Sequence, residues 1–346
     1  MKNEEQRMNK LVKKTCEWVL PVVLGAFILY WVYRDFDFDK AGDVLLHGVD
    51  WGWMSVSLLF GVLAQLFRGW RWRQTLEPLG AFPRRHDCVN AIFVSYAASL
   101  VVPRIGEVSR CGVLAKYDNV SFAKSLGTVV TERLIDTVTI LLITLVTVVL
   151  QLPVFVTFLH QTGTKIPSLF HLLTSVWFYI ILFCVIGVLL LLYALRKTLF
   201  FYEKVKGVVL NVWEGVMSLK GVRNIPLFLF YTFSIWLCYF LHFYFTFYCF
   251  SFTAHLGILP ALVMFVGGTF AVIVPTPNGA GPWHFAVITM MMLYGVNATD
   301  AGIFALIVHA VQTFLVVLLG IYGMVALKTP EDPLNSPGGG AYAARE

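Results

Sequence analysis

Between Arg223 and Lys328 the chain carries a single charged side chain, Asp300. Soluble domains contain about 25% charged residues. Here the charged fraction is 13%, 58% of the 346 residues are hydrophobic, and the mean hydropathy is +0.75. A soluble fold of this length could not bury so much apolar surface. The composition therefore excludes a cytosolic enzyme, a disordered protein and a nucleic-acid-binding module, and it predicts an all-α polytopic membrane protein.

The apolar runs predict about six full transmembrane helices, because a span needs about 20 apolar residues. The runs cover residues 18–33, 51–67, 134–152, 171–195, 226–252 and 301–327. Lys and Arg gather in a few segments between these runs, as they do in cytoplasmic loops. We therefore expect a multi-pass protein of the cell (inner or cytoplasmic) membrane with both termini in the cytoplasm. The aspartate-rich segment 34–50 is then expected outside.

The spans divide the chain into two membrane halves with short flanking regions. The expected parts are a cytoplasmic N-terminus (1–17), a first half (18–152), a second half (153–328) and a disordered Pro/Gly-rich tail (329–346). Within the second half, segment 196–223 interleaves basic and apolar residues, which predicts a cytoplasmic amphipathic helix at the membrane interface.

Each half contains a short apolar segment that is interrupted by Pro and Gly. The first, near 88–120, has basic flanks on both sides, which is typical of a re-entrant hairpin. The second, near 256–295, breaks at residues 275–282; it is either re-entrant or two full spans. Together they predict two broken or re-entrant hairpins arranged as an inverted repeat. Paired interrupted segments of this kind indicate a transporter's binding site.

Arg104, Glu107 and Arg110 follow the break in the first hairpin at spacings of three. On a helix these side chains share a face and could form an ion-pair ladder at the cytoplasmic interface. They could equally form a substrate-binding cradle for a lipid phosphate, because two arginines against one glutamate leave a positive charge.

Glu132, Arg133 and Asp136 lie at the start of the next span. The two carboxylates are four residues apart and share a helix face, where lipid would be an unfavourable neighbour. We expect them to pair with Arg104 or Arg110 across the hairpin. Their role is either a structural brace or proton or ion coupling.

The second break contains Asn278, Gly279, Gly281 and His284. Glycine allows a backbone to approach a ligand closely, so the first three are candidate substrate-binding residues. A tight structural turn is the alternative. His284 is a candidate for coupling or bracing, although an interior histidine is more often simply hydrogen-bonded.

Arg68, Arg71 and Arg73 alternate with two tryptophans after the second span. This pattern is typical of a positive-inside anchor in an aromatic belt. The same residues could contact anionic lipid at the membrane surface.

The six cysteines form no CxxC pair, and most lie in apolar runs, so we expect neither disulfides nor a metal site. No nucleotide-binding loop or nucleophile motif occurs. We therefore expect no cofactor and no catalytic residues.

Three motifs occur in the order in which they occur in a known family. They are Arg68-Gly-Trp-Arg-Trp72, Pro103-Arg-Ile-Gly-Glu-Val-Ser-Arg110 and Thr131-Glu-Arg-Leu-Ile-Asp136. Over roughly residues 15–328 the chain resembles the transmembrane (flippase-like) region of lysylphosphatidylglycerol synthetases. Relatives tend to carry P-G-G-x-G and a glutamate at the second break, whereas this chain has Asn278 and His284 there.

The resemblance implies lipid translocation between leaflets, and it implies a stand-alone member that lacks the soluble aminoacyl-transferase domain. The expected partner is a membrane phospholipid or lipid-linked substrate held between the two hairpins. Binding of nucleic acid is not expected. Two alternatives stay open. The chain could be a membrane enzyme acting on lipid-linked substrates, with Glu107 as its acid, or a non-transporting partner of a separately encoded lipid-modifying enzyme.

Overall fold

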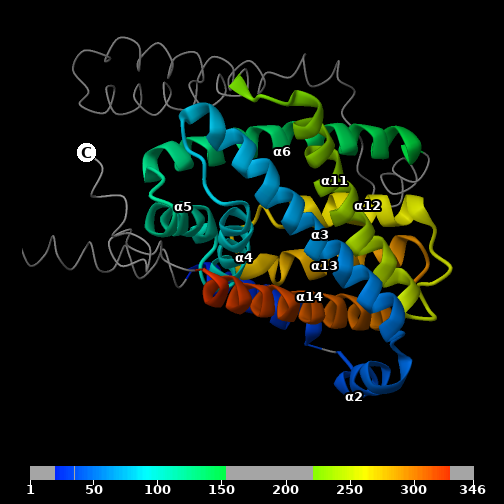
Figure 1. Ribbon diagram of the computed structural model, residues 1–346. Coiled ribbons are helices and arrows are strands. Elements are labelled where there is room, and N and C mark those ends of the chain that lie inside the picture. Colours follow the sequence, from blue (N-terminus) through cyan, green and yellow to red (C-terminus); the bar gives the residue numbers. More distant parts are fainter. Residues whose placement is uncertain (1–19, 35, 153–220, 328–346) are drawn as a thin grey trace, which may run out of the picture.

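The computed structural model describes residues 20–34, 36–152 and 221–327, and every regular element within these ranges is a helix (Figure 1). The α-helices, in chain order, are Leu20–Tyr33, α2 (Phe38–Asp43), α3 (Trp51–Leu76), α4 (Arg85–Val101), α5 (Ile105–Tyr117), α6 (Phe122–Leu150), α11 (Ile225–Tyr244), α12 (Ile258–Ala271), α13 (Pro282–Leu293) and α14 (Ala298–Ala326). Short helical turns extend three of them: η1 (Val44–Gly48), η2 (Glu77–Leu79) and η5 (Phe245–Cys249). A further turn, η6 (Pro277–Gly279), lies in the connection between α12 and α13. The all-helical prediction is confirmed.

Three of the described helices are long and apolar enough to cross a membrane: α6, α11 together with η5, and α14. A fourth span is possible if the bent pair Phe38–Gly48 and Trp51–Leu79, which meet at 91°, counts as one. The helix Leu20–Tyr33 and α12 are apolar but shorter. The predicted span 171–195 lies outside the described residues, as do the predicted N-terminus 1–17, the tail 329–346 and most of segment 196–223.

Helix α3 runs well beyond the span predicted to end at residue 67. It begins where the Asp50 carboxylate accepts hydrogen bonds from the backbone N–H groups of Gly52 (2.8 Å) and Trp53 (3.2 Å), an N-cap that satisfies free donors. It continues to Leu76 because Arg68 and Arg71 point into the protein and do not mark a helix end. The aspartate-rich segment 34–50, for which no helix was predicted, contains α2 and η1.

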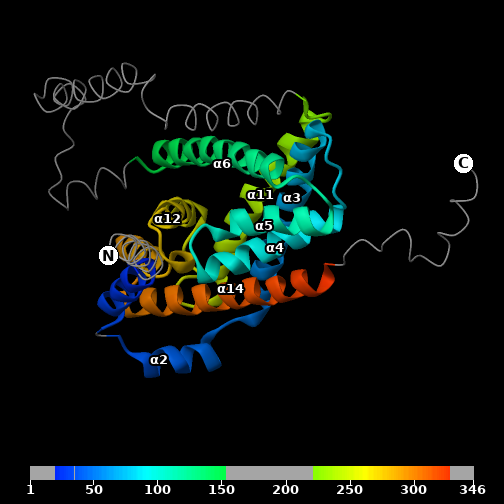
Figure 2. The same ribbon diagram turned by 90° about the vertical axis from the view of Figure 1, so that its left-hand side faces the viewer.

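Both interrupted segments form helix pairs. Helices α4 and α5 pack side by side (Figure 2) and turn at Arg104, whose φ of 66° lies in the left-handed region. Gly106 makes this pairing possible, because a Cβ there would overlap the carbonyl oxygen of Ser95 on α4. Helices α12 and α13 form the second pair, and their connection uses positive φ at Asn278, Gly279 and Gly281.

Two apolar cores lie toward opposite ends of α3. The first joins the start of α3 to η5, α12, α13 and α14; its largest members are Met54, Phe247, Phe250, Met264 and Phe304. The second joins the end of α3 to α4, α5 and α6; its largest members are Trp72, Leu76, Ile92 and Leu114. Helix α14 packs closely on α4 through Gly320 and Gly323. The candidate site lies at the edge of the second core.

Candidate functional site

A network of five charged side chains connects α3, α5 and α6. Arg68 donates a hydrogen bond from Nη2 to Oδ2 of Asp136 (2.7 Å), and Arg71 donates from Nη2 to Oδ1 of the same carboxylate (2.8 Å). Arg71 also reaches Oε1 of Glu132 (3.4 Å). Arg110 forms an ion pair with the other oxygen of Glu132 (2.7 Å). Each carboxylate therefore bridges two arginines.

The network lies inside the protein. The Arg71 side chain is 0% exposed, as is that of Glu132, and Arg110 is 1% exposed. Removing a charge from water is costly unless other groups pair with it. Among the described residues, Arg68, Arg71 and Arg110 form ion pairs only with Glu132 and Asp136, so one positive charge of the network is in excess.

Helical spacing produces this convergence. Arg68 and Arg71 are three residues apart on α3, and Glu132 and Asp136 are four apart on α6, so each pair occupies one helix face. Thr128 Oγ1 accepts a hydrogen bond from Nε1 of Trp72 (3.0 Å), which aligns the two helices. The guanidinium of Arg110 lies 4.5 Å from the centre of the Trp72 ring, a cation–π contact that holds α5 against α3.

The buried network has a partly exposed rim, formed by Arg104, Glu107 and Arg133. Arg133 is 45% exposed and bonds Glu107 Oε1 at 3.1 Å, and its Nη1 lies 3.9 Å from Asp136. Arg104 is exposed at the turn between α4 and α5 and has no ion pair within the described residues. The rim thus joins the buried network to the surface at the hairpin.

Several arginine nitrogens of the network are buried without a hydrogen-bond acceptor in the part of the chain that the structure describes. They are Nε and Nη1 of Arg68, Nε of Arg71, and Nε and Nη2 of Arg110. Buried polar groups normally have partners. The free donors and the excess positive charge both fit an anion or water as an additional partner.

The base of the first hairpin is also held by charge. Arg84 Nε lies 2.6 Å from Asp87 and 3.0 Å from Asp118, which connects the start of α4 to the end of α5. Burial, followed by the neighbouring Asp118 carboxylate, raises the pKa of Asp87 above its ordinary value. The hairpin is therefore fastened at both ends.

The sequence-predicted residues of the first hairpin come together only in part. Arg110 pairs with Glu132 across the hairpin, as expected, whereas Arg104 does not. Asp136 pairs with Arg68 and Arg71, which were expected at the membrane surface. These two arginines lie inside, because each has a buried carboxylate within reach of its helix face. Their partnership was missed, although their spacing matches that of the carboxylates on α6.

The second connection is attached to α14. Asn278 donates from Nδ2 to Thr313 Oγ1 (2.7 Å), and its carbonyl oxygen lies 3.1 Å from His309 Nε2. The centre of the His284 ring lies 4.5 Å from that of His309, with the two rings tilted by 54°, and His284 Nδ1 accepts a hydrogen bond from the Gly281 N–H at 3.3 Å. Gly281 also packs against the helix Leu20–Tyr33. These contacts are those of a braced turn, and η6 within it contacts α4 of the first hairpin.

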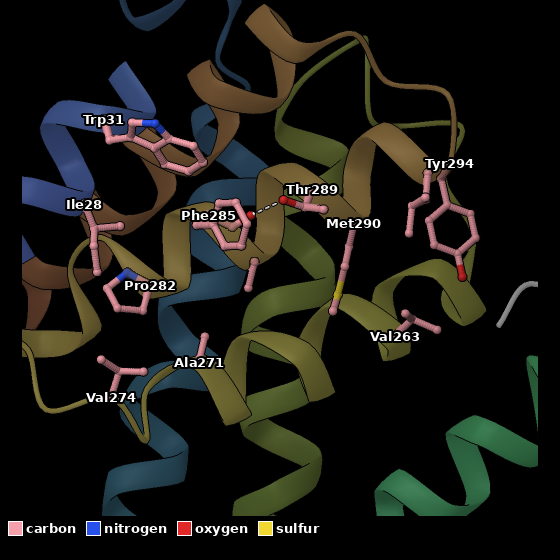
Figure 3. A pocket seen from close by; sticks show the side chains of 12 residues that line it. Ile28, Trp31, Val263, Ala271, Val274, Pro282, Phe285, Thr289, Met290 and Tyr294 are labelled. Carbon is pink, nitrogen blue, oxygen red and sulfur yellow. Dashed lines mark hydrogen bonds between the residues drawn. The ribbon is translucent and has the colours of Figure 1, made fainter. Parts of the chain in front are cut away.

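An apolar cavity of about 520 Å³ lies beside the second hairpin (Figure 3). Ile28 and Trp31 approach it from the first described helix, while Phe285 and Met290 of α13 and Ala271 of α12 form other walls. The side chains facing the cavity are almost all apolar, so its chemistry suits a hydrocarbon chain.

The described part of the chain was predicted to contain neither a disulfide nor a metal site. No group of three or more His, Cys, Asp or Glu there could hold a metal ion. The four described cysteines, Cys88, Cys111, Cys238 and Cys249, are buried free thiols.

Comparison with known proteins identifies the family. Residues 18–320 match the family described as the lysylphosphatidylglycerol synthase TM region. The chain belongs to this family. It is also similar to a UPF0104 membrane protein, MJ1078, of Methanocaldococcus jannaschii, with 26% identity over 242 residues, 68% of this chain and 97% of that protein. No solved structure matches the chain. With the apolar helices above, these matches make it a multi-pass membrane protein.

Proposed function

We propose that this member of the lysylphosphatidylglycerol synthase TM region family moves a phosphate-bearing lipid headgroup between membrane leaflets. The observation that carries the proposal is the buried network of Arg68, Arg71, Arg110, Glu132 and Asp136, which holds one positive charge more than it neutralises. An intramembrane charge is costly and is normally kept for function. A lipid phosphate would neutralise the excess and provide acceptors for the free arginine nitrogens.

In this proposal the rim receives the headgroup. Arg104 is exposed at the hairpin turn and Arg133 is half-exposed beside it, so both are accessible to a phosphate at the membrane interface. The phosphate would compete with Glu107 for Arg133, and the excess charge of the network would favour its inward movement. The two hairpins would form the halves of an inverted repeat that rock against each other around the headgroup.

A fluorescent-lipid flipping assay in proteoliposomes tests this proposal. An arginine–phosphate contact contributes about 1.5–3 kcal/mol, so the variant Arg104→Gln/Arg133→Gln is expected to flip lipid at least about tenfold more slowly. Both residues are partly or fully exposed, and their loss should leave the fold intact. The matched control is Lys116→Gln, an exposed cation at the end of α5, which should flip at the parent rate. Equal rates in both variants would contradict the proposed site.

The enzyme alternative is less well supported. It needs a free carboxylic acid at the hairpin, and Glu107 is bonded to Arg133 at 3.1 Å. We expect no turnover of lipid-linked sugars by the purified protein.

We also propose that the basic end of α3 and the α4–α5 hairpin face the cytoplasm, with both termini on that side. Lys116 is exposed at the end of α5. Ser251 is exposed after η5, which follows the C-terminal end of α11. In intact cells a membrane-impermeant maleimide is expected to label Ser251→Cys but not Lys116→Cys. Labelling of the parent chain, measured in parallel, provides the background from its own six cysteines, of which the four described ones are buried. The reverse labelling pattern would overturn this orientation.

A further inference from the structure

In addition to the apolar cavity beside the second hairpin, a polar cavity of about 410 Å³ lies between the end of α3 and the start of α11. Arg73, Gln74 and Glu77 line it from the α3 side, and Arg223 and Asn224 from the α11 side. Its size is within the range of small-ligand sites. It opens at the basic end of α3.

The charges that line the cavity do not balance. Arg73 is already engaged, because its Nη1 pairs with Glu77 (3.2 Å) and its Nε donates to the carbonyl oxygen of Pro83 (3.0 Å). Arg85 and Arg223 are exposed at the mouth, and neither has an ion pair within the described residues. Two positive charges are therefore left to attract an anion.

The start of α11 adds to this attraction. Asn224 caps the helix by accepting a hydrogen bond from the Leu227 N–H (3.0 Å), and both residues line the cavity. The first turn of this 20-residue helix presents the positive end of its dipole. The attraction comes from the dipole rather than from a row of N–H donors, because Pro226 has no N–H and those of Leu227 and Phe228 donate to Asn224. Anionic oxygens are the natural ligands of such a helix end when arginines stand beside it.

Two other features indicate a lipid headgroup. Trp70 and Tyr231 line the cavity with their ring centres 6.0 Å apart, and aromatic pairs of this kind lie at headgroup depth in membranes. The side-chain oxygen of Gln74 is buried and has no hydrogen-bond donor among the described residues. It needs a donor, which a hydroxyl or amine beyond the phosphate would supply.

We infer that this cavity binds the headgroup of a phospholipid whose phosphate carries a hydroxyl or amine substituent. Arg85 and Arg223 hold the phosphate at the start of α11, and Gln74 accepts a hydrogen bond from the substituent. None of the residues that line this cavity belongs to the Arg110–Glu132 network, and binding here does not depend on transport. Failure of lipid binding here would leave the flipping proposal untouched, and the reverse also holds.

Native mass spectrometry of the full chain from nanodiscs tests the inference. A basic residue near a lipid surface contributes about 1 kcal/mol, or about fivefold in affinity. Arg85→Gln/Arg223→Gln is therefore expected to retain phosphatidylglycerol about 25-fold less well than the parent, with Lys116→Gln as the unchanged control. Unchanged retention in the double variant would overturn the site.

Two further arms identify the source of the phosphate and the role of Gln74. The parent should prefer phosphatidylglycerol, which has hydroxyl donors, over phosphatidylcholine, which has none, and Gln74→Met should reduce this preference about fivefold or more. Free glycerol phosphate and inorganic phosphate should not displace the lipid at millimolar concentration. Displacement by either, or an unaltered preference in Gln74→Met, would contradict the lipid-headgroup assignment.

Discussion

Replacing Asp136 with asparagine is expected to lower the free energy of unfolding by about 3–5 kcal/mol, because breaking a buried ion pair leaves uncompensated charge in the interior. Asp136 accepts hydrogen bonds from Arg68 (2.7 Å) and Arg71 (2.8 Å), and both guanidinium groups are buried. Without this carboxylate, three arginines face Glu132 alone. The loss should appear as a lower SDS midpoint and a lower melting temperature of the purified protein in mild detergent.

Glu107→Gln is the matched control for that experiment. It also removes a carboxylate that bonds an arginine, but the pair with Arg133 is 37% and 45% exposed. Exposed pairs contribute about 0–1 kcal/mol, so this variant should melt close to the parent. Equal destabilisation by the two variants would show that the network is not the stabilising element described here.

A second substitution separates charge excess from lost packing. Arg68→Gln in the Asp136→Asn background removes the cation that has lost its one carboxylate partner among the described residues, whereas Arg71 still reaches Glu132. The double variant should therefore be more stable than Asp136→Asn alone, since contacting residues are coupled by about 0.5–3 kcal/mol. Simple additivity of the two losses would argue against a shared electrostatic cause.

Apolar length and charge placement were sufficient to predict most helices, because the requirements for crossing a membrane are strong and local. The spans expected at 226–252 and 301–327 correspond to Ile225–Cys249 and Ala298–Ala326. The interruptions near 103 and 275–282 were predictable from Pro and Gly, and both separate packed helix pairs. The end of α3 was not predictable in this way. An arginine that follows an apolar run looks the same in the sequence whether the helix ends there or continues with the arginine buried.

The partners of the charged residues were harder to predict, since pairing depends on which helix faces meet. The ion pair between Arg110 and Glu132 was predictable, because the hairpin is directly followed by the helix that carries Glu132. Arg68 with Asp136 joins residues on α3 and α6, and nothing local distinguishes a buried arginine from a surface anchor. Asn278 with Thr313 likewise depends on the packing of α14. The candidate site was therefore predicted only in part. The sequence indicated its two carboxylates and Arg110, but it did not indicate that Arg68 and Arg71 are buried with them.

The turn of the first hairpin should tolerate no side chain at Gly106. A Cβ at this position would overlap the carbonyl oxygen of Ser95 and the hydroxyl of Ser99, and the Ser95 carbonyl belongs to the backbone of α4, which has little room to shift. Gly106→Ala should force α5 away from α4 and carry Arg110 away from Glu132. Overpacking typically costs about 1–3 kcal/mol and sometimes more. We expect a loss near or above the top of that range, measured by SDS titration, and a matching loss of flipping.

Gly112→Ala provides the control on the same helix. Nothing lies within 4 Å of a Cβ built at Gly112, so alanine there meets no neighbour among the described residues. Alanine is favoured over glycine inside a helix by about 0.5–1 kcal/mol, so this variant should match or slightly exceed the parent in stability. A stable Gly106→Ala protein with normal flipping would mean that α4 and α5 do not pack as closely as described. The same packing places Arg110 beside Glu132. That result would therefore also mean that Arg110 does not connect the rim residues to the buried network, and a headgroup phosphate would have no route from the rim into the network.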